Sequence, residues 1–180
     1  MTEQQRKRSG SDSADYGTEL GNFVQRIVTT AKPRLAVESR GDDGFTLALA
    51  RGLSENGFGK LITCDSDATR CAQVQQEVAA AGFTALVEVR NQPVLESKIE
   101  GNIDLLFSST NYSSVNYEQV VQRFLPQINP FGLLLLHTSE GDYEKAREFA
   151  LRLDREGILS VVLLPANLKL VMAQKRSGRK

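Results

Sequence analysis

The sequence predicts an α/β protein with a three-layer, doubly wound fold, whose seven-stranded sheet is mostly parallel and ends in a C-terminal antiparallel hairpin. Short apolar runs alternate with helical patterns between residues 35 and 156, which is typical of a parallel sheet covered by helices on both faces. The last two apolar runs, 159–164 and 168–173, are too close for a crossover helix, so we expect that pair to be antiparallel.

The N-terminal half predicts a helix followed by alternating strands and helices. Apolar residues recur at helical spacing from Leu20 to Val28, and Pro33 prevents this helix from continuing. Asp67 is the expected N-cap of a later helix, and Gly82 its stop. The predicted elements are a strand ending in Glu38, a turn at 41–44, a helix at 45–53, a strand at 61–64 ending in Asp65, a helix at 68–81, and a strand at 83–89.

The C-terminal half continues the alternation before the closing hairpin. The run at 103–108 is apolar almost throughout, as expected for a strand that is covered on both faces. Pro126 and the segment 129–132 interrupt the pattern, and Gly157 closes the last helix. The predicted elements are a short helix or turn at 94–99, a strand at 103–108, a helix at 117–125, a strand at 133–136 that ends at His137, and a helix at 143–156.

Length and charge indicate one domain with no general attraction to polyanions. The chain has 180 residues and balances 22 basic against 22 acidic side chains, so no overall field draws it to nucleic acid or membrane. We expect residues 1–17 to be a disordered tail, because they contain little to bury, 18–175 to be a single domain, and 176–180 to be a basic tail.

The cysteines and the hydropathy indicate a cytoplasmic protein. Cys64 and Cys71 fit neither a chelating pair nor a disulfide framework, and we expect them to pack in a strand and a helix. No apolar run approaches the roughly 18 residues of a membrane span, and the N-terminus is polar, unlike a signal sequence.

Two carboxylates at strand tips suggest an adenosine-bearing cofactor. In a parallel sheet the tips after Glu38 and Asp65 face the same edge, where ligands bind in doubly wound folds. The turn at 41–44 is small enough for a ligand to approach the backbone, and the carboxylate of Asp65 can accept hydrogen bonds from two ribose hydroxyls.

The order of these segments resembles the class I S-adenosylmethionine-dependent methyltransferases, a Rossmann-like family, and within it the catechol-type O-methyltransferases. The resemblance spans roughly residues 18 to 175. The segments that carry it are Val37-Glu38, the run from Gly44 to Ala50, Leu61 to Asp67, Ile103 to Phe107, and Pro130 to His137.

The resemblance implies a site for S-adenosyl-L-methionine. Glu38 would lie under the methionine end, and the loop containing Gly41, Asp43 and Gly44 would wrap the cofactor. Asp65 would accept the ribose hydroxyls, with Asn91 or Gln92 beside the adenine. The structural alternative for Asp65 is an exposed acid that stabilises the N-terminus of the following helix.

Arg40 departs from the family, which favours small residues, above all glycine, in this loop. Glycine serves there because the backbone takes positive φ and comes close to the ligand. The Arg40 guanidinium either binds the methionine carboxylate as a charged partner or obstructs the pocket.

The tips of the fourth and fifth strands predict that no metal is bound. Many relatives place aspartates there to hold a divalent cation, which prefers anionic oxygen ligands. Here the tips are Ser108 to Asn111 and His137 to Ser139, which offer hydroxyls and one amide instead.

The same tips provide the candidate catalytic and substrate-binding residues. His137, the only histidine, could be the base that deprotonates a methyl acceptor, or it could simply cap the strand by hydrogen bonding. Ser109, Asn111 and Tyr112 are candidate substrate contacts. Asn111-Tyr112 lacks the prolines of the Asn-Pro-Pro-Tyr signature of enzymes that methylate amino groups of nucleic acids, so we do not expect a nucleic-acid substrate.

Three functions follow from these features. The first is a metal-independent methyltransferase that acts on oxygen of a small molecule, and the second is a non-catalytic descendant that serves as a cofactor-binding or partner subunit. The third is a domain for another nucleotide such as NAD, against which the missing Gly-x-Gly-x-x-Gly turn argues. The chain adds few loops to its core, so we expect an open site or one completed by a second subunit in a homodimer.

Overall fold

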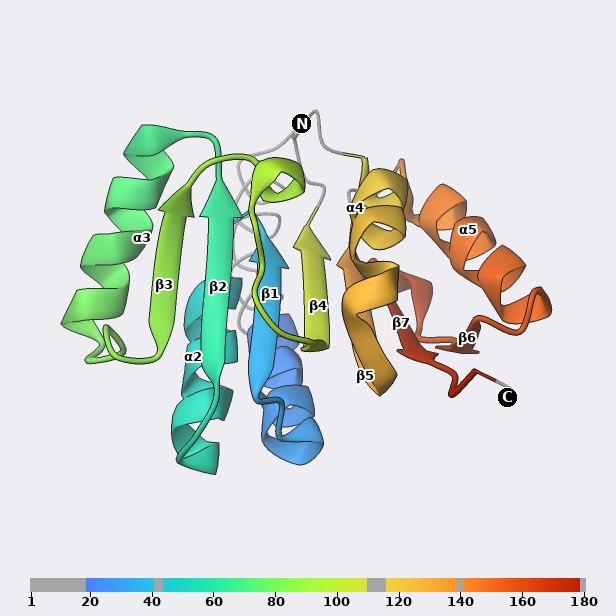
Figure 1. Cartoon of the computed structure of the whole chain (residues 1–180), viewed down its shortest axis with the longest axis horizontal. Helices are drawn as coiled ribbons and strands as arrows, with labels where there is room; N and C mark the ends of the chain where they lie inside the picture. Colours follow the sequence, from blue (N-terminus) through green and yellow to red (C-terminus); the bar gives the residue numbers. More distant parts are fainter. Residues whose placement is uncertain (1–18, 41–43, 110–115, 139–140, 179–180) are drawn as a thin grey trace, which may run out of the picture.

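A computed structural model describes residues 19–40, 44–109, 116–138 and 141–178. Within them the strands form one seven-stranded sheet in the order β3-β2-β1-β4-β5-β7-β6 (Figure 1). Neighbouring strands from β3 to β5 are parallel, and β7 is antiparallel to both β5 and β6. The strands are β1 Leu35–Ser39, β2 Lys60–Asp65, β3 Val87–Asn91, β4 Ile103–Ser109, β5 Ile128–His137, β6 Leu159–Val162 and β7 Leu170–Lys175.

Helices cover both faces of this sheet, which produces two hydrophobic cores. One core packs side chains of α4 and α5 against Val37, Ile62 and Leu134, whereas the other packs the helix at 19–31, α2 and α3 against alternate strand residues such as Ala36 and Leu61. The other helical segments are α2 Phe45–Asn56, α3 Ala68–Ala80, α4 Tyr117–Phe124, α5 Tyr143–Arg155, and the 3-10 turns η1 Val94–Glu96, η2 Leu125–Gln127 and η3 Ala166–Leu168.

The predicted cap and stops of two helices and the antiparallel hairpin are confirmed, but the helix predicted at 45–53 extends to Asn56 and the last strand, predicted at 168–173, is Leu170–Lys175. The carboxylate of Asp67 accepts hydrogen bonds from the backbone N–H groups of Thr69 at 2.9 Å and Arg70 at 3.2 Å, so it is the N-cap of α3. Gly82 and Gly157 follow α3 and α5 with φ of 78° and 76°, conformations that favour glycine after a helix.

The predicted third strand began too early in the sequence. Residues 84–86 form a turn, in which the N–H groups of Leu86 and Val87 donate to the carbonyl oxygen of Phe83 at 2.9 and 3.1 Å. The strand β3 therefore starts at Val87 and extends to Asn91. An apolar run alone did not distinguish the turn from the strand.

The predicted fifth strand began too late. β5 starts at Ile128, which pairs with Ile103, and the register then shifts so that Leu105 pairs with Leu133. Phe131 lies in this irregular stretch with φ of 68°, and a Cβ on Gly132 would come within 2.6 Å of Ile128 Cγ2. Pro130 and Gly132, which were predicted to break the preceding helix, instead lie in an irregular stretch of β5.

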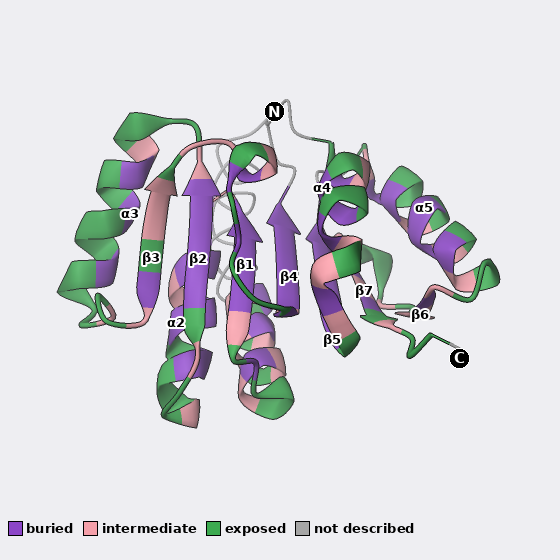
Figure 2. Cartoon of the chain, viewed as in Figure 1, coloured by how far each residue is buried: buried purple, intermediate pink, exposed green. Residues whose placement is uncertain are grey.

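The central strands are buried along most of their length, whereas the outer surfaces of the helices are exposed (Figure 2). Cys64 and Cys71 are buried in β2 and α3, as predicted, and are not joined in a disulfide. None of the helices in the described part of the chain combines the length and the apolar composition that a membrane crossing needs.

Candidate functional site at the strand tips

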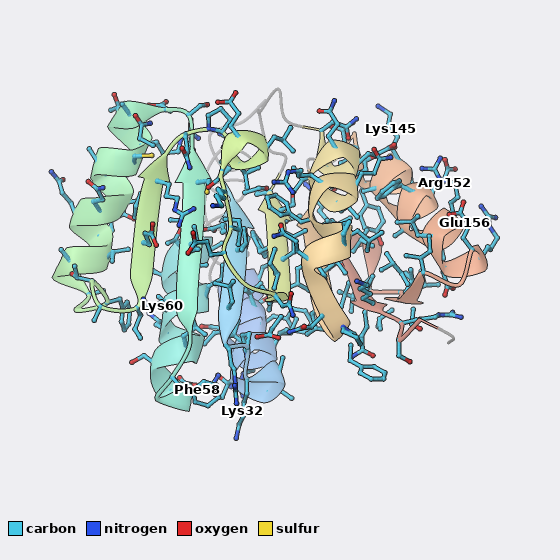
Figure 3. All side chains as sticks on the ribbon, in the orientation of Figure 1. Lys32, Phe58, Lys60, Lys145, Arg152 and Glu156 are labelled. Carbon is cyan, nitrogen blue, oxygen red and sulfur yellow. The ribbon has the colours of Figure 1, made fainter. Side chains whose placement is uncertain are left out.

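The carboxyl ends of the parallel strands share one edge of the sheet, where the arrowheads of β1 to β4 lie together (Figure 1). The strand order reverses at β1, which lies between β2 and β4, and such a switch point is where doubly wound folds bind ligands. Lys32, Phe58 and Lys60 lie at the opposite end of the sheet (Figure 3). The described residues at the tips are Glu38, Ser39, Arg40, Cys64, Asp65, Asn91, Gln92, Ser108, Ser109, His137 and Thr138.

Glu38 is completely buried near the end of β1. Its Oε2 accepts a hydrogen bond of 2.7 Å from the hydroxyl of Thr46, in the first turn of α2. A buried carboxylate is costly unless hydrogen bonds or cations compensate it, so this contact holds the side chain in place at the edge of the site.

Arg40 follows β1 in a backbone conformation that glycine would adopt more readily. Its φ is 90°, and its N–H donates to the carbonyl oxygen of Cys64 on β2 at 2.7 Å. Gly44 precedes α2 with φ of 80°, and a Cβ there would meet no heavy atom within 4 Å. Gly41 and Asp43, also predicted to wrap a cofactor, lie outside the described residues together with Asp42.

Asp65 at the tip of β2 is engaged by neighbouring residues of the chain. Its Oδ1 accepts the backbone N–H of Asp67 at 2.8 Å, and its Oδ2 lies 3.1 Å from Nε of Arg70 on α3. Its side chain is 10% exposed. The structural alternative was an exposed acid that stabilises the N-terminus of the following helix. Asp65 is largely buried instead, and the residue that caps α3 is Asp67.

Asn91 and Gln92 lie together at the end of β3 but turn to different partners. The Asn91 amide donates to the carbonyl oxygen of Asp65 at 3.2 Å, which ties β3 to β2. The Gln92 amide donates to the hydroxyl of Ser97 at 2.8 Å, just beyond η1. Of the two predicted adenine neighbours, Asn91 is thus the one joined to Asp65.

The tips of β4 and β5 bring polar groups and aromatic rings together. Ser39 donates to the hydroxyl of Ser108 at 2.8 Å, across β1 and β4. The Ser109 hydroxyl lies 3.5 Å from Nδ1 of His137. The imidazole is buried and lies 4.8 Å from the ring of Phe45, centroid to centroid. His137 and Ser109 are therefore neighbours on the paired strands β5 and β4.

Charges and burial shift the pKa of several groups near this edge. Burial raises the pKa of the thiols of Cys64 and Cys71. A backbone hydrogen bond from Arg70 lowers the pKa of Asp67, and a hydrogen bond from the side chain of Arg90 lowers that of Glu88. The thiols are thus held protonated, and these two carboxylates are held ionised.

Three comparisons with known proteins place this geometry in context. No family model matches the chain. It is 25% identical over 154 residues to a catechol O-methyltransferase from Niastella koreensis, covering 85% of this chain but only 59% of that protein's length. The chain is also similar to a solved methyltransferase structure from Geobacter sulfurreducens, with a TM-score of 0.72 and 19% identity. The match covers 87% of this chain and 78% of the Geobacter chain.

An O-methyltransferase from Bacillus cereus, solved in complex with S-adenosylhomocysteine, gives a TM-score of 0.69 at 21% identity and covers 87% of this chain and 80% of its own. The chain has the class I methyltransferase fold. The predicted Rossmann-like architecture, with its antiparallel C-terminal pair, is confirmed.

Two residues of the site at the strand tips were not predicted from the sequence. Thr46 holds Glu38, and Arg70 pairs with Asp65. Arg70 lies three residues after the N-cap Asp67, a spacing that places an arginine beside a capping carboxylate. From this spacing, contact of Arg70 with the carboxylates at the start of α3 was predictable. Nothing in the sequence distinguished Thr46 from an ordinary residue of the first helical turn.

The tips of β4 and β5 remain the place where a metal would be sought in this fold. The described residues include no group of three His, Cys, Asp or Glu side chains that could hold a metal ion. Ser108, Ser109 and His137 are described there, whereas Asn111 and Tyr112, two predicted substrate contacts, lie outside the described residues. The donors that are described suit hydrogen bonding better than a hard cation.

Proposed function

We propose that this protein binds S-adenosyl-L-methionine at the tips of β1, β2 and β3 and methylates oxygen of a small molecule without a metal ion. One observation carries the proposal, namely that Glu38 and Asp65 lie near the carboxyl ends of adjacent parallel strands at the switch point of the sheet. Two carboxylates at this edge suit a ligand with ribose hydroxyls at one end and positive charge at the other.

The residues present fit that cofactor. Asp65 would bind the ribose and Asn91 would lie beside the adenine, with Gln92 as the alternative neighbour. Glu38 would face the positively charged ammonium and sulfonium groups, and Gly44, where a Cβ would meet open space, would line the loop with Gly41 and Asp43. When bound, S-adenosylmethionine supplies a methyl group activated by the sulfonium.

Arg40 is proposed to bind the carboxylate of the methionine end. It follows directly on β1, the strand that carries Glu38, so both charged residues lie at the same tip. A guanidinium is the side chain best suited to a carboxylate, because its planar donors match the two oxygens.

His137 is the proposed catalytic base. It is buried at the tip of β5, and Ser109 lies against Nδ1. A neutral imidazole can take the proton that an acceptor hydroxyl loses as its oxygen gains the methyl group. Ser109, Asn111 and Tyr112 are the proposed substrate contacts.

The named similarities support oxygen as the methyl acceptor. The Niastella protein is a catechol O-methyltransferase, and the Bacillus protein is an O-methyltransferase solved with S-adenosylhomocysteine. A small hydroxylated molecule is therefore the proposed substrate class. We also propose that the protein is cytoplasmic and has no nucleic-acid partner. The chain spans about three fifths of the Niastella protein's length. A second copy of this chain is the proposed partner that completes an open site.

A non-catalytic cofactor-binding or partner subunit is the second candidate. The observation that favours it is Arg40, which occupies a glycine-like backbone position with φ of 90°. A chain that has lost its activity could retain the fold and replace loop glycines in this way.

Transfer of a labelled methyl group from S-adenosylmethionine to catechol and simple phenols, with and without EDTA, tests the proposal. We expect S-adenosylhomocysteine to raise the melting temperature, because a ligand that binds only the folded protein stabilises it. We expect turnover to persist in EDTA, because the described tips of β4 and β5 offer hydroxyls and an imidazole and no carboxylates for a metal ion. Turnover that EDTA abolishes and Mg²⁺ restores would contradict metal independence. A thermal shift without methyl transfer to any acceptor would favour the non-catalytic candidate.

A further inference from the structure

The guanidinium of Arg70 contacts Asp65, the carboxylate that is proposed to bind the ribose of the cofactor. Its Nε lies 3.1 Å from Oδ2 of Asp65, and its Nη2 lies 3.3 Å from Oδ2 of Asp67. The Arg70 side chain is 29% exposed, and that of Asp65 is 10% exposed. The guanidinium therefore bridges the two aspartates at the start of α3.

The contacts of Asp65 limit what a ribose could reach. Oδ1 already accepts the backbone N–H of Asp67, and Oδ2, on which Arg70 lies, is buried. A carboxylate has about four lone-pair positions. A ribose whose hydroxyls donate two hydrogen bonds to Asp65 must therefore reach an oxygen that Arg70 now covers.

We propose that Arg70 sets the affinity for the cofactor by competing with the ribose hydroxyls for Asp65. This inference rests on the proposed function, because it assumes that Asp65 is the ribose acceptor. Binding would require the guanidinium to leave Oδ2, and the ion pair that is lost would lower the affinity.

Asp67 provides a place for the displaced guanidinium. Its side chain is 47% exposed, and it already contacts Nη2 of Arg70. Arg70 can therefore release Asp65 and keep one charged partner, which lowers the cost of the displacement. Asp67 would thus favour ligand binding although it lies outside the ribose contacts.

Calorimetric titration with S-adenosylhomocysteine, and separately with adenosine, tests this competition. Arg70→Ala should tighten the binding of both ligands by up to about fivefold, since a partly exposed ion pair contributes up to about a factor of five. Asp67→Asn should weaken both ligands, because asparagine still caps the helix but no longer offers a charge to Arg70. Adenosine contains the ribose but lacks the methionine end, so a change in its affinity reports on the ribose contacts alone.

Arg147→Ala is the matched control. Arg147 on α5 pairs with Glu144 at 3.0 Å, with the same i,i+3 spacing as Arg70 and Asp67. Removal of the Arg147 side chain should leave the affinities for S-adenosylhomocysteine and adenosine unchanged. Equal or weaker binding of adenosine by Arg70→Ala than by the wild type would overturn the inference and leave the proposed function standing. Absence of binding by both proteins at millimolar ligand would overturn the inference and the proposed ribose site together.

Discussion

At the scale of single residues, Arg40 is the clearest departure from what the fold requires. Its φ of 90° lies in the region that favours glycine, and a non-glycine residue in a sparsely populated region costs about 1–3 kcal/mol. The chain keeps an arginine there despite this cost. In the proposed methyltransferase, the guanidinium would offset this cost by binding the methionine carboxylate.

Comparison of Arg40→Gly with Arg40→Ala separates the backbone from the side chain. Arg40→Gly should raise the free energy of unfolding by about 1 kcal/mol relative to Arg40→Ala, because only glycine relieves the strain. Both variants should bind S-adenosylhomocysteine more weakly, by about 1.5–3 kcal/mol, because both lose the partner of the methionine carboxylate. Chemical denaturation and calorimetry measure the two effects, and tighter binding by either variant would show that Arg40 obstructs the site.

The buried thiols give a second residue-scale prediction. Burial raises the pKa of Cys64 and Cys71 above their ordinary value of 9.0, so folding favours the protonated thiols. This contribution to stability is fully present below about pH 9 and is lost as the pH rises through the raised pKa in the folded state. Ellman's reagent at pH 8 should therefore react slowly with the native protein and rapidly after denaturation, whereas rapid reaction of the native protein would contradict the burial.

At the scale of elements, close packing of the helix at 19–31 against α2 depends on Gly52. A Cβ there would lie 2.6 Å from Val28 Cβ and 2.8 Å from the carbonyl oxygen of Gln25. Gly52→Ala should therefore destabilise the fold by about 1–3 kcal/mol, the usual cost of overpacking. Thermal or chemical denaturation measures the loss.

Gly21→Ala is the control in the partner helix. Its Cβ would lie 3.9 Å from Ala48 Cβ, an ordinary contact, so the higher helix propensity of alanine should stabilise the fold by up to about 1 kcal/mol. Equal effects of the two substitutions would mean that the helices do not pack as described.

Element order was predictable from the sequence because apolar runs, caps and stops mark it locally. Asp67, Gly82 and Gly157 fixed the ends of two helices. The start of β5 was not predictable in this way, because the pairing of Ile128 with Ile103 depends on a distant strand. The same limit explains the missed site contacts, since Thr46 matters only where α2 lies beside Glu38.

At the scale of the whole molecule, the fold brings polar residues from separate segments to one edge of the sheet. Glu38, Asp65 and Asn91 come from three adjacent strands, and the parallel register alone places their tips together. The sequence predicted this convergence, but not that Arg70 and Asp67 would already contact Asp65. Those contacts depend on the first turn of α3 and on the side-chain conformations within it.

Titration of S-adenosylhomocysteine into the wild type and into Asp65→Ala, followed by calorimetry, tests most directly whether this edge is the cofactor site. We expect the wild type to bind the ligand. We expect Asp65→Ala to weaken binding by about 1.5–3 kcal/mol, the usual contribution of a hydrogen bond to a charged group, less the affinity regained because Arg70 no longer competes. No binding by the wild type at millimolar ligand, or equal affinities of the two proteins, would contradict a cofactor site at this edge.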